Sequence, residues 1–159
     1  MRKINIFLAS SIIELSAERN EIDVFLRKFS DWLEDEYCVT LHPVRCENMD
    51  PAYTLERKQE EYNQYLIECD LAFFIFLSRV GEYTREEFEV AKRQFEKTGR
   101  PQCFVYVIER EFYEESLSVF LEELERVYHV PYKICRDMDM LKNQIKKNIC
   151  IYVGKGERL

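Results

Sequence analysis

The length, composition and charge of the chain exclude several classes of protein. Its 159 residues, of which 14% are aromatic and only four glycine and four proline, can form one domain with a core and are neither disordered nor of low complexity. Its net charge of −7 disfavours a general binder of nucleic acid or of an anionic membrane, because both partners demand a basic face.

The first third of the chain alternates between strand and helix patterns. Residues 4–9 are an apolar run typical of a strand, and residues 14–36 carry apolar side chains at helical spacing. Residues 39–41 predict a short second strand. A long loop, residues 42–53, follows it and contains an Asp-Pro pair that signals a turn and a helix entry.

The middle of the chain repeats this alternation around one long apolar run. Residues 54–68 predict a second helix, and residues 71–77 predict a strand that is buried on both faces, as in a parallel sheet. Residues 84–97 predict a third helix with Phe88, Ala91 and Phe95 inward, stopped by Gly-Arg-Pro. A fourth strand is expected at residues 102–108.

The last third completes the pattern with a helix at residues 114–128, a short strand at 132–135 and an amphipathic helix at 138–153. Five strand–helix alternations predict an α/β fold with three layers, flavodoxin-like in its connections, with a five-stranded parallel sheet and helices on both faces. We expect one domain, residues 1–153. The tail, residues 154–159, is typical of the start of a linker to further domains.

The six cysteines and two histidines predict no metal site. The cysteines stand singly, without a C-x-x-C pair or a histidine at zinc-ligand spacing. Unpaired thiols favour a reduced, cytoplasmic location. No apolar stretch approaches the roughly 18 residues of a membrane span, so we expect no membrane partner.

Glu87 is the side chain on which a functional interpretation depends most. It is predicted in the first turn of a helix that follows a buried strand, at the edge where open α/β sheets bind their ligands. An ionised carboxylate beside a sugar stabilises an oxocarbenium-like transition state or attacks it. On sequence alone the structural explanation is favoured, since Thr84 and Glu87 have the spacing of a capping box.

Other polar residues are predicted at the same edge. Ser10 and Ser11 follow the first strand, and a helix start there favours phosphate, although Ser11 and Glu14 also fit a capping box. Ser78 ends the third strand and is a candidate contact for a polar ligand group, or part of a solvated loop. Tyr83 has an aromatic ring suited to stacking on a purine or pyridine. Arg45, in the loop after the second strand, is a weaker candidate for a phosphate.

Several common catalytic signatures are missing from the sequence. Neither His42 nor His129 has a serine or cysteine partner by motif, so no catalytic triad is predicted. There is no Walker loop and no dinucleotide-binding glycine pattern. A bound nucleotide must therefore be held in another way.

Three short motifs stand in order within residues 3–110. The first is residues 6–11, followed by Glu14-Leu15 and Glu18-Arg19, and the second is residues 69–78, an apolar strand ending in serine. The third consists of Gly81, Tyr83, Thr84, Glu87 and Ala91. Together they resemble the TIR-like superfamily with its nucleoside deoxyribosyltransferase relatives. They look closest to the TIR-like domains at the amino terminus of bacterial multidomain ATPase-containing proteins of the STAND type.

This resemblance implies a role for one glutamate. In the TIR pattern Trp-Cys-x-x-Glu-Leu, Tyr83 and Thr84 stand in place of the tryptophan and cysteine, and Glu87 matches the glutamate. The transferase pattern Gly-Thr-x-x-Glu-x-Gly-x-Ala is satisfied at Thr84, Glu87 and Ala91. In both groups the matched glutamate is the carboxylate that cleaves an N-glycosidic bond. The loop after the second strand lacks the expected glycine after Pro51, so its residues are not carried over.

The function that the resemblance implies is an NAD+-cleaving hydrolase domain of a bacterial defence or signalling protein. NAD+ would be its substrate, with no separate cofactor, and self-association would complete the site. Glu87 would stabilise the sugar cation or form a transient ester, Tyr83 would stack on a ring, and Ser10-Ser11 would hold phosphate or ribose. Two alternatives stay open: a non-catalytic interaction module in which Glu87 is only a cap, and a nucleoside 2-deoxyribosyltransferase.

Overall fold

The computed structural model describes residues 1–10, 12–44 and 55–156. Its strands form a five-stranded sheet of order β2-β1-β3-β4-β5, in which every neighbouring pair is parallel. The strands are β1 (Arg2–Ala9), β2 (Val39–Val44), β3 (Leu71–Phe76), β4 (Gln102–Ile108) and β5 (Tyr132–Cys135). The predicted flavodoxin-like sheet is therefore confirmed.

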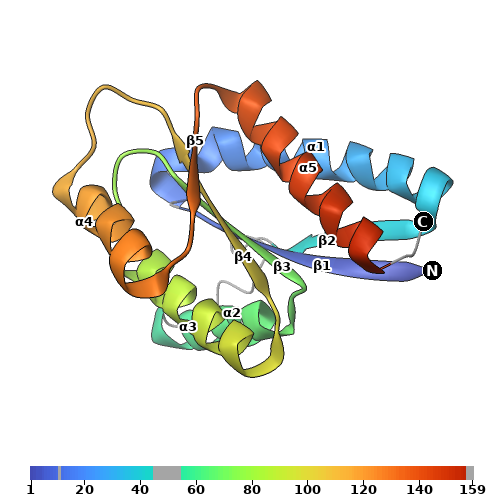
Figure 1. Ribbon diagram of the computed structural model, residues 1–159, viewed down its shortest axis with the longest axis horizontal. Coiled ribbons are helices and arrows are strands. Elements are labelled where there is room, and N and C mark those ends of the chain that lie inside the picture. Colours follow the sequence, from blue (N-terminus) through green and yellow to red (C-terminus); the bar gives the residue numbers. More distant parts are fainter. Residues whose placement is uncertain (11, 45–54, 157–159) are drawn as a thin grey trace.

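Helices connect the strands and cover both faces of the sheet (Figure 1). They are α1 (Ile12–Tyr37), α2 (Leu55–Glu68), α3 (Glu82–Thr98), α4 (Glu115–Glu123) and α5 (Met138–Gly156). A π-helical turn, Leu124–Tyr128, continues α4, so the predicted helix at residues 114–128 is α-helical only in its first part. The last helix extends three residues past the expected boundary at residue 153.

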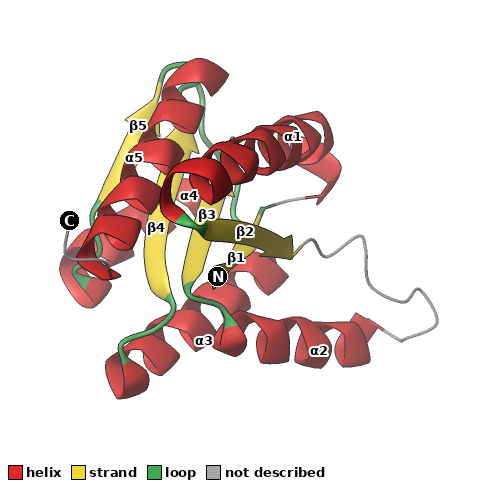
Figure 2. Ribbon diagram, turned by 90° about the vertical axis from the view of Figure 1, so that its right-hand side faces the viewer, coloured by secondary structure: helices red, strands yellow, loops and turns green. Residues whose placement is uncertain are grey.

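Alternating side chains of the central strands build one core on each face. Ile4, Ile6 and Leu8 of β1 belong to the cluster that contains the buried residues of α1 and α5. Phe7 and Ala9 belong to the cluster that contains those of α2, α3 and α4. This division is the period of two that a strand imposes on its side chains. Figure 1 shows the resulting layers, with α1 and α5 on one face and α2, α3 and α4 on the other. Figure 2 shows α1 on one side of the sheet and α2 and α3 on the other.

β3 is the most deeply buried strand. All six residues from Leu71 to Phe76 are buried, as its unbroken apolar sequence predicted, because a central parallel strand has helices on both faces. β1 and β3 lie side by side, but the chain leaves β1 towards β2 and leaves β3 towards β4. Their carboxyl ends form the topological switch point, where open α/β sheets bind ligands.

Two further sequence-based details of the fold are wrong. β2 runs to Val44 rather than ending at residue 41, so His42 lies in the strand and not in the following loop. Pro43 is accommodated because β2 is an edge strand. Phe95, expected to point inward from α3, is 37% exposed, whereas Phe88 and Ala91 are fully buried.

Candidate active site at the carboxyl end of the sheet

α3 begins two residues earlier than the sequence predicted. Its N-cap is Gly81 and its first residue is Glu82, and the amide of Arg85 donates to the carbonyl oxygen of Gly81 at 3.0 Å. Thr84 is therefore the third helical residue rather than the cap, and Glu87 lies in the second turn. Gly81 has the extended backbone of an N-cap, with φ −76° and ψ 154°, and no side chain caps this end.

This shift removes the capping-box explanation of Glu87. In a capping box the glutamate is the third helical residue, and here that position is held by Thr84. The helix dipole does not explain a carboxylate at this position either, because its effect falls off beyond the first turn. What remains is a glutamate whose side chain is only 5% exposed.

Glu87 shares its face of α3 with three other buried residues, which are Thr84, Phe88 and Ala91. Thr84, three positions before Glu87, is 8% exposed, so the two side chains lie on neighbouring turns of one face. Buried polar groups are costly unless they find partners. A helix that serves only packing needs no carboxylate at such a position. Tyr83, in contrast, is 46% exposed on the first turn of α3.

Aromatic contacts fix the turn that carries Glu87. The ring of Phe88 makes edge-to-face contacts with Phe74 of β3 at 5.3 Å, with Phe120 of α4 at 5.2 Å and with Tyr128 at 5.2 Å between ring centroids. Such pairs stabilise packing beyond the area they bury. Arg85 adds an ion pair to Glu123 of α4. These contacts hold the backbone of Glu87 against both the sheet and α4.

The loop between β3 and α3 is attached to the start of α4. The carbonyl oxygen of Ser78 accepts a hydrogen bond from the amide of Glu114 at 2.8 Å, and the amide of Val80 donates to the hydroxyl of Ser116 at 3.1 Å. A cavity of about 680 Å³ opens beside Ser78. Its lining residues are Ser78, Glu109, Arg110, Glu111, Phe112 and Glu114.

Ser10 stands one residue beyond the end of β1. Ala9 pairs with Phe74, so Ser10 lies alongside the last residues of β3. The side chain is 7% exposed, and its hydroxyl has no hydrogen-bond partner among the residues that the structure describes. A buried hydroxyl of this kind costs free energy and calls for an explanation.

Sequence reasoning gave Arg19 no role in a site. Its side chain is 1% exposed, and its guanidinium donates to the carbonyl oxygen of Ser10 at 2.8 Å and to that of Leu8 at 3.4 Å. The sequence signal is weak: an arginine on the predicted inner face of the first helix, where the other inward residues are apolar. Only the tertiary structure shows that this cation lies at the end of β1.

The structure thus brings four of the seven predicted residues, Ser10, Ser78, Thr84 and Glu87, to the carboxyl end of the sheet in buried or half-buried positions. Tyr83 lies at the same end but is exposed. Ser11 and Arg45 lie outside the described residues, as does most of the predicted loop at residues 42–53.

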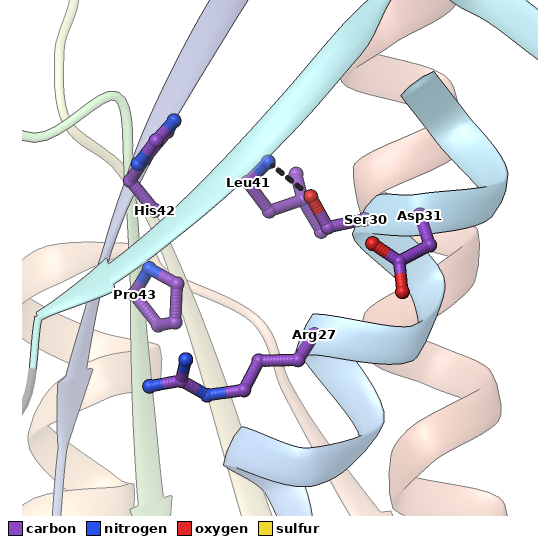
Figure 3. Close-up of a pocket in the computed structure, with 6 residues that line it drawn as sticks. All are labelled: Arg27, Ser30, Asp31, Leu41, His42 and Pro43. Atoms are coloured by element: carbon purple, nitrogen blue, oxygen red, sulfur yellow. Dashed lines mark hydrogen bonds between the residues drawn. The ribbon is translucent and has the colours of Figure 1, made fainter. Parts of the chain in front are cut away.

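A second cavity, of about 390 Å³, lies between α1 and the edge strand β2 (Figure 3). It is lined by Arg27, Ser30, Asp31, Leu41, His42 and Pro43, and so includes none of the predicted site residues. Figure 3 shows Ser30 of α1 reaching β2, where its hydroxyl accepts a hydrogen bond from the amide of Leu41 at 2.9 Å. This cavity belongs to the sheet edge rather than to the candidate site.

Within the described part of the chain, no cluster of three or more histidine, cysteine or acidic side chains could hold a metal ion. In the same residues, none of the helices has the length and apolar character that crossing a membrane requires.

Comparison with known proteins gives a likeness in fold. No protein-family model matches the chain, and no curated protein sequence matches it. The solved structure of the CMP N-glycosidase BcmB from Clostridium botulinum is similar, with a TM-score of 0.56 and 16% sequence identity. The similarity covers 91% of this chain and 98% of that one. The two proteins share a fold over nearly their whole lengths.

Proposed function

We propose that the protein cleaves the N-glycosidic bond of a nucleotide and that Glu87 is its catalytic carboxylate. The observation that carries this proposal is the burial of Glu87 at the carboxyl end of the sheet, in the second turn of α3, where it does not cap the helix. A carboxylate held in a protected position beside the ligand-binding edge is suited to stabilising positive charge on a sugar.

The reaction needs one carboxylate and one water molecule. As the bond between C1′ and the base nitrogen breaks, its electron pair leaves with the base and positive charge develops on the sugar. A carboxylate oxygen of Glu87 stabilises this charge or bonds to C1′ as an ester. Water then adds to C1′, its hydroxyl stays on the sugar, its proton is released, and the carboxylate is regenerated. A neutral base such as cytosine must take up a proton as it leaves, whereas nicotinamide leaves NAD+ without one.

The choice of a nucleotide as substrate rests on two supports. The chain shares its fold with a CMP N-glycosidase, which favours a nucleoside monophosphate. The buried hydroxyl of Ser10 is a hydrogen-bond donor suited to a phosphate or ribose oxygen.

NAD+ is the second candidate substrate. The observation that favours it is Tyr83, whose exposed ring stands at the start of the helix that carries Glu87 and is suited to stacking on nicotinamide or adenine. In this version the domain acts in bacterial defence or signalling and self-associates to complete its site. Ser78 and Thr84 would contact polar groups of the substrate, and Ser11 and Arg45 would approach a phosphate.

The deciding experiment is to incubate the purified protein separately with CMP, NAD+, cytidine and deoxyadenosine and to identify the products by liquid chromatography and mass spectrometry. We expect free base from at least one nucleotide. A Glu87→Ala preparation made in parallel should release none, which excludes a contaminating nucleosidase.

Each other outcome has a distinct meaning. Transfer of deoxyribose from deoxyadenosine to added cytosine, without hydrolysis of nucleotides, would indicate the transferase function instead. The protein is tested at a low and at a high concentration. If it cleaves none of the four compounds at either concentration, a non-catalytic interaction module is the better explanation.

A further inference from the structure

Arg19 is a buried cation that the proposed mechanism does not yet use. Its side chain is 1% exposed, which makes it one of the largest fully buried side chains of the protein. Arginine keeps its positive charge in proteins, and removing a charged group from water is costly. A position on the inner face of α1 would be filled at lower cost by an apolar side chain, as at Leu15, Ile22 and Leu26.

The guanidinium of Arg19 binds the end of β1 and the residue that follows it. One nitrogen, Nη1, donates to the carbonyl oxygen of Ser10 at 2.8 Å, and the other, Nη2, donates to that of Leu8 at 3.4 Å. The ladder between β1 and β2 ends at the pair Phe7 and Val44, so both carbonyl groups lie beyond it. The planar fork of arginine takes two acceptors in a fixed geometry, which the single ammonium of lysine does not reproduce.

Ser10 is the residue whose position this fork determines. Its carbonyl oxygen is bound to Arg19, while its hydroxyl is buried without a hydrogen-bond partner among the described residues. A carbonyl group fixed in direction also fixes the peptide plane of its residue, and with it the base of the side chain. Ser10 is therefore held rigidly, with one polar group left for a ligand.

We propose that Arg19 is a positioning residue: through two hydrogen bonds to the end of β1 it holds the hydroxyl of Ser10 in place to bind the nucleotide. This inference rests on the proposed function, because it assigns Ser10 to the same substrate site. Arg19 itself touches the backbone and is not a catalytic residue.

A double-mutant cycle separates positioning from simple stabilisation of the strand. The four proteins are the unmodified chain, Arg19→Lys, Ser10→Ala and the double variant, and their affinities for CMP and NAD+ are measured by calorimetry. We expect each single variant to weaken binding of the preferred nucleotide about tenfold, the effect of roughly one hydrogen bond. The double variant should be no weaker than either single variant, because the two residues act through one contact.

The matched control is Arg27→Lys, which changes a 68% exposed arginine of the same helix that pairs with Asp23. It should bind nucleotide like the unmodified protein. Thermal unfolding of each variant shows whether it is folded. If Arg19→Lys does not fold, the nucleotide affinity of Ser10→Ala is the deciding measurement. Unchanged affinity in that variant overturns the inference.

The remaining results also have fixed meanings. Unchanged affinity in folded Arg19→Lys, or losses that add up to about a hundredfold in the double variant, would overturn the positioning role. If the four affinities follow the expected cycle but neither nucleotide is cleaved, the positioning role of Arg19 is supported and the proposed hydrolysis is rejected. Absence of binding of CMP and NAD+ by the unmodified protein would reject both.

Discussion

The two ends of the β-sheet differ in how their polar groups are satisfied. At the amino end, the carboxylate of Asp70 accepts hydrogen bonds from the amide of Asn5 at 2.9 Å, from Arg100 at 3.3 Å and from the hydroxyl of Tyr152 at 3.4 Å. Its own amide donates to the carbonyl oxygen of Asn5 at 2.9 Å. One side chain thus links β1, the start of β4 and α5.

The carboxyl end buries its polar groups more deeply. Ser10 keeps a buried hydroxyl without a described partner, Glu87 is buried without capping its helix, and Arg19 is buried against backbone carbonyls. The two ends therefore differ: the polar groups at the amino end pair with one another, whereas the carboxyl end buries a hydroxyl without a described partner. Proteins tolerate such costly groups mainly where function requires them.

The largest effect is expected from Glu87→Gln, which removes one negative charge at the carboxyl end while keeping the shape of the side chain. Turnover of the preferred nucleotide should fall about 1,000-fold or more, because the amide cannot stabilise a sugar cation. Because the change is isosteric, the midpoint of thermal unfolding should shift by only a few degrees. Steady-state kinetics and thermal unfolding on the same sample measure both.

Glu86→Gln is the matched control, since Glu86 is the exposed neighbour whose carboxylate accepts a long hydrogen bond of 3.4 Å from Asn63. It should leave both turnover and stability unchanged. Equal losses of turnover in the two variants would show that the charge of α3 in general, and not position 87, matters.

The second-largest effect is expected at the amino end of the sheet, where a substitution should change stability rather than turnover. Asp70→Asn should lower the free energy of unfolding by about 1.5 kcal/mol. The amide of asparagine replaces a carboxylate that accepts hydrogen bonds from Asn5 and Tyr152, and the half-exposed ion pair with Arg100 adds little. Turnover per folded molecule should be unchanged. Urea unfolding measures the first quantity, and kinetics well below the unfolding midpoint measure the second.

Asp35→Asn, at an exposed position of α1, is the control for the loss of one charge. It should change the free energy of unfolding by less than about 0.5 kcal/mol. If Asp70→Asn reduced turnover without reducing stability, the division of roles between the two ends of the sheet would be wrong.

The sequence predicted the fold better than the site because apolar patterning acts locally. The boundaries of β4 and β5 are those expected, and β3 is one residue shorter, since buried strands are marked by continuous apolar runs between turn residues. The start of α3 was wrong because the capping-box spacing of Thr84 and Glu87 favours a helix register that begins at Thr84, whereas the helix begins after Gly81. Choosing between the registers depends on the backbone at Gly81, which the local pattern does not specify.

The candidate site was only partly accessible to sequence reasoning for a different reason. Glu87, Ser10 and Ser78 could be placed at one end of the sheet because parallel topology brings the carboxyl ends of strands together. The role of Arg19 could not be predicted, since its acceptors are backbone carbonyls that no side-chain motif records. The roles of Ser11 and Arg45 stay predictions.

A third, smaller effect concerns the edge strand β2. Ser30→Ala removes the hydroxyl that accepts the hydrogen bond from Leu41 (Figure 3) and should lower the free energy of unfolding by about 1 kcal/mol. Turnover should not change. Ser16→Ala, at an exposed position of the same helix, should be neutral or slightly stabilising because alanine favours helices. A loss of turnover in Ser30→Ala would extend the functional region to this edge.

The smallest effect concerns the reactivity of the thiols. It tests whether the amino end of the sheet excludes solvent and reagents. Burial, helped by the negative charges of Asp70 and Glu68, raises the pKa of the Cys69 thiol to about 12. At pH 8 this thiol should stay protonated and unmodified by a maleimide, whereas the exposed Cys38 should react within minutes. Peptide mapping by mass spectrometry reads each position separately.

The same raised pKa fixes the direction of a pH effect on stability. Between about pH 9 and 12 the folded protein keeps the Cys69 proton while the unfolded chain loses it, so the free energy of unfolding should fall as the pH rises through this range. Cys69→Ala should flatten that decline, at the cost of a small cavity beside Leu66 and Phe74. Rapid labelling of Cys69 in the native protein at pH 8 would mean that the amino end opens readily, and the contrast between the two ends would then rest on the carboxyl end alone.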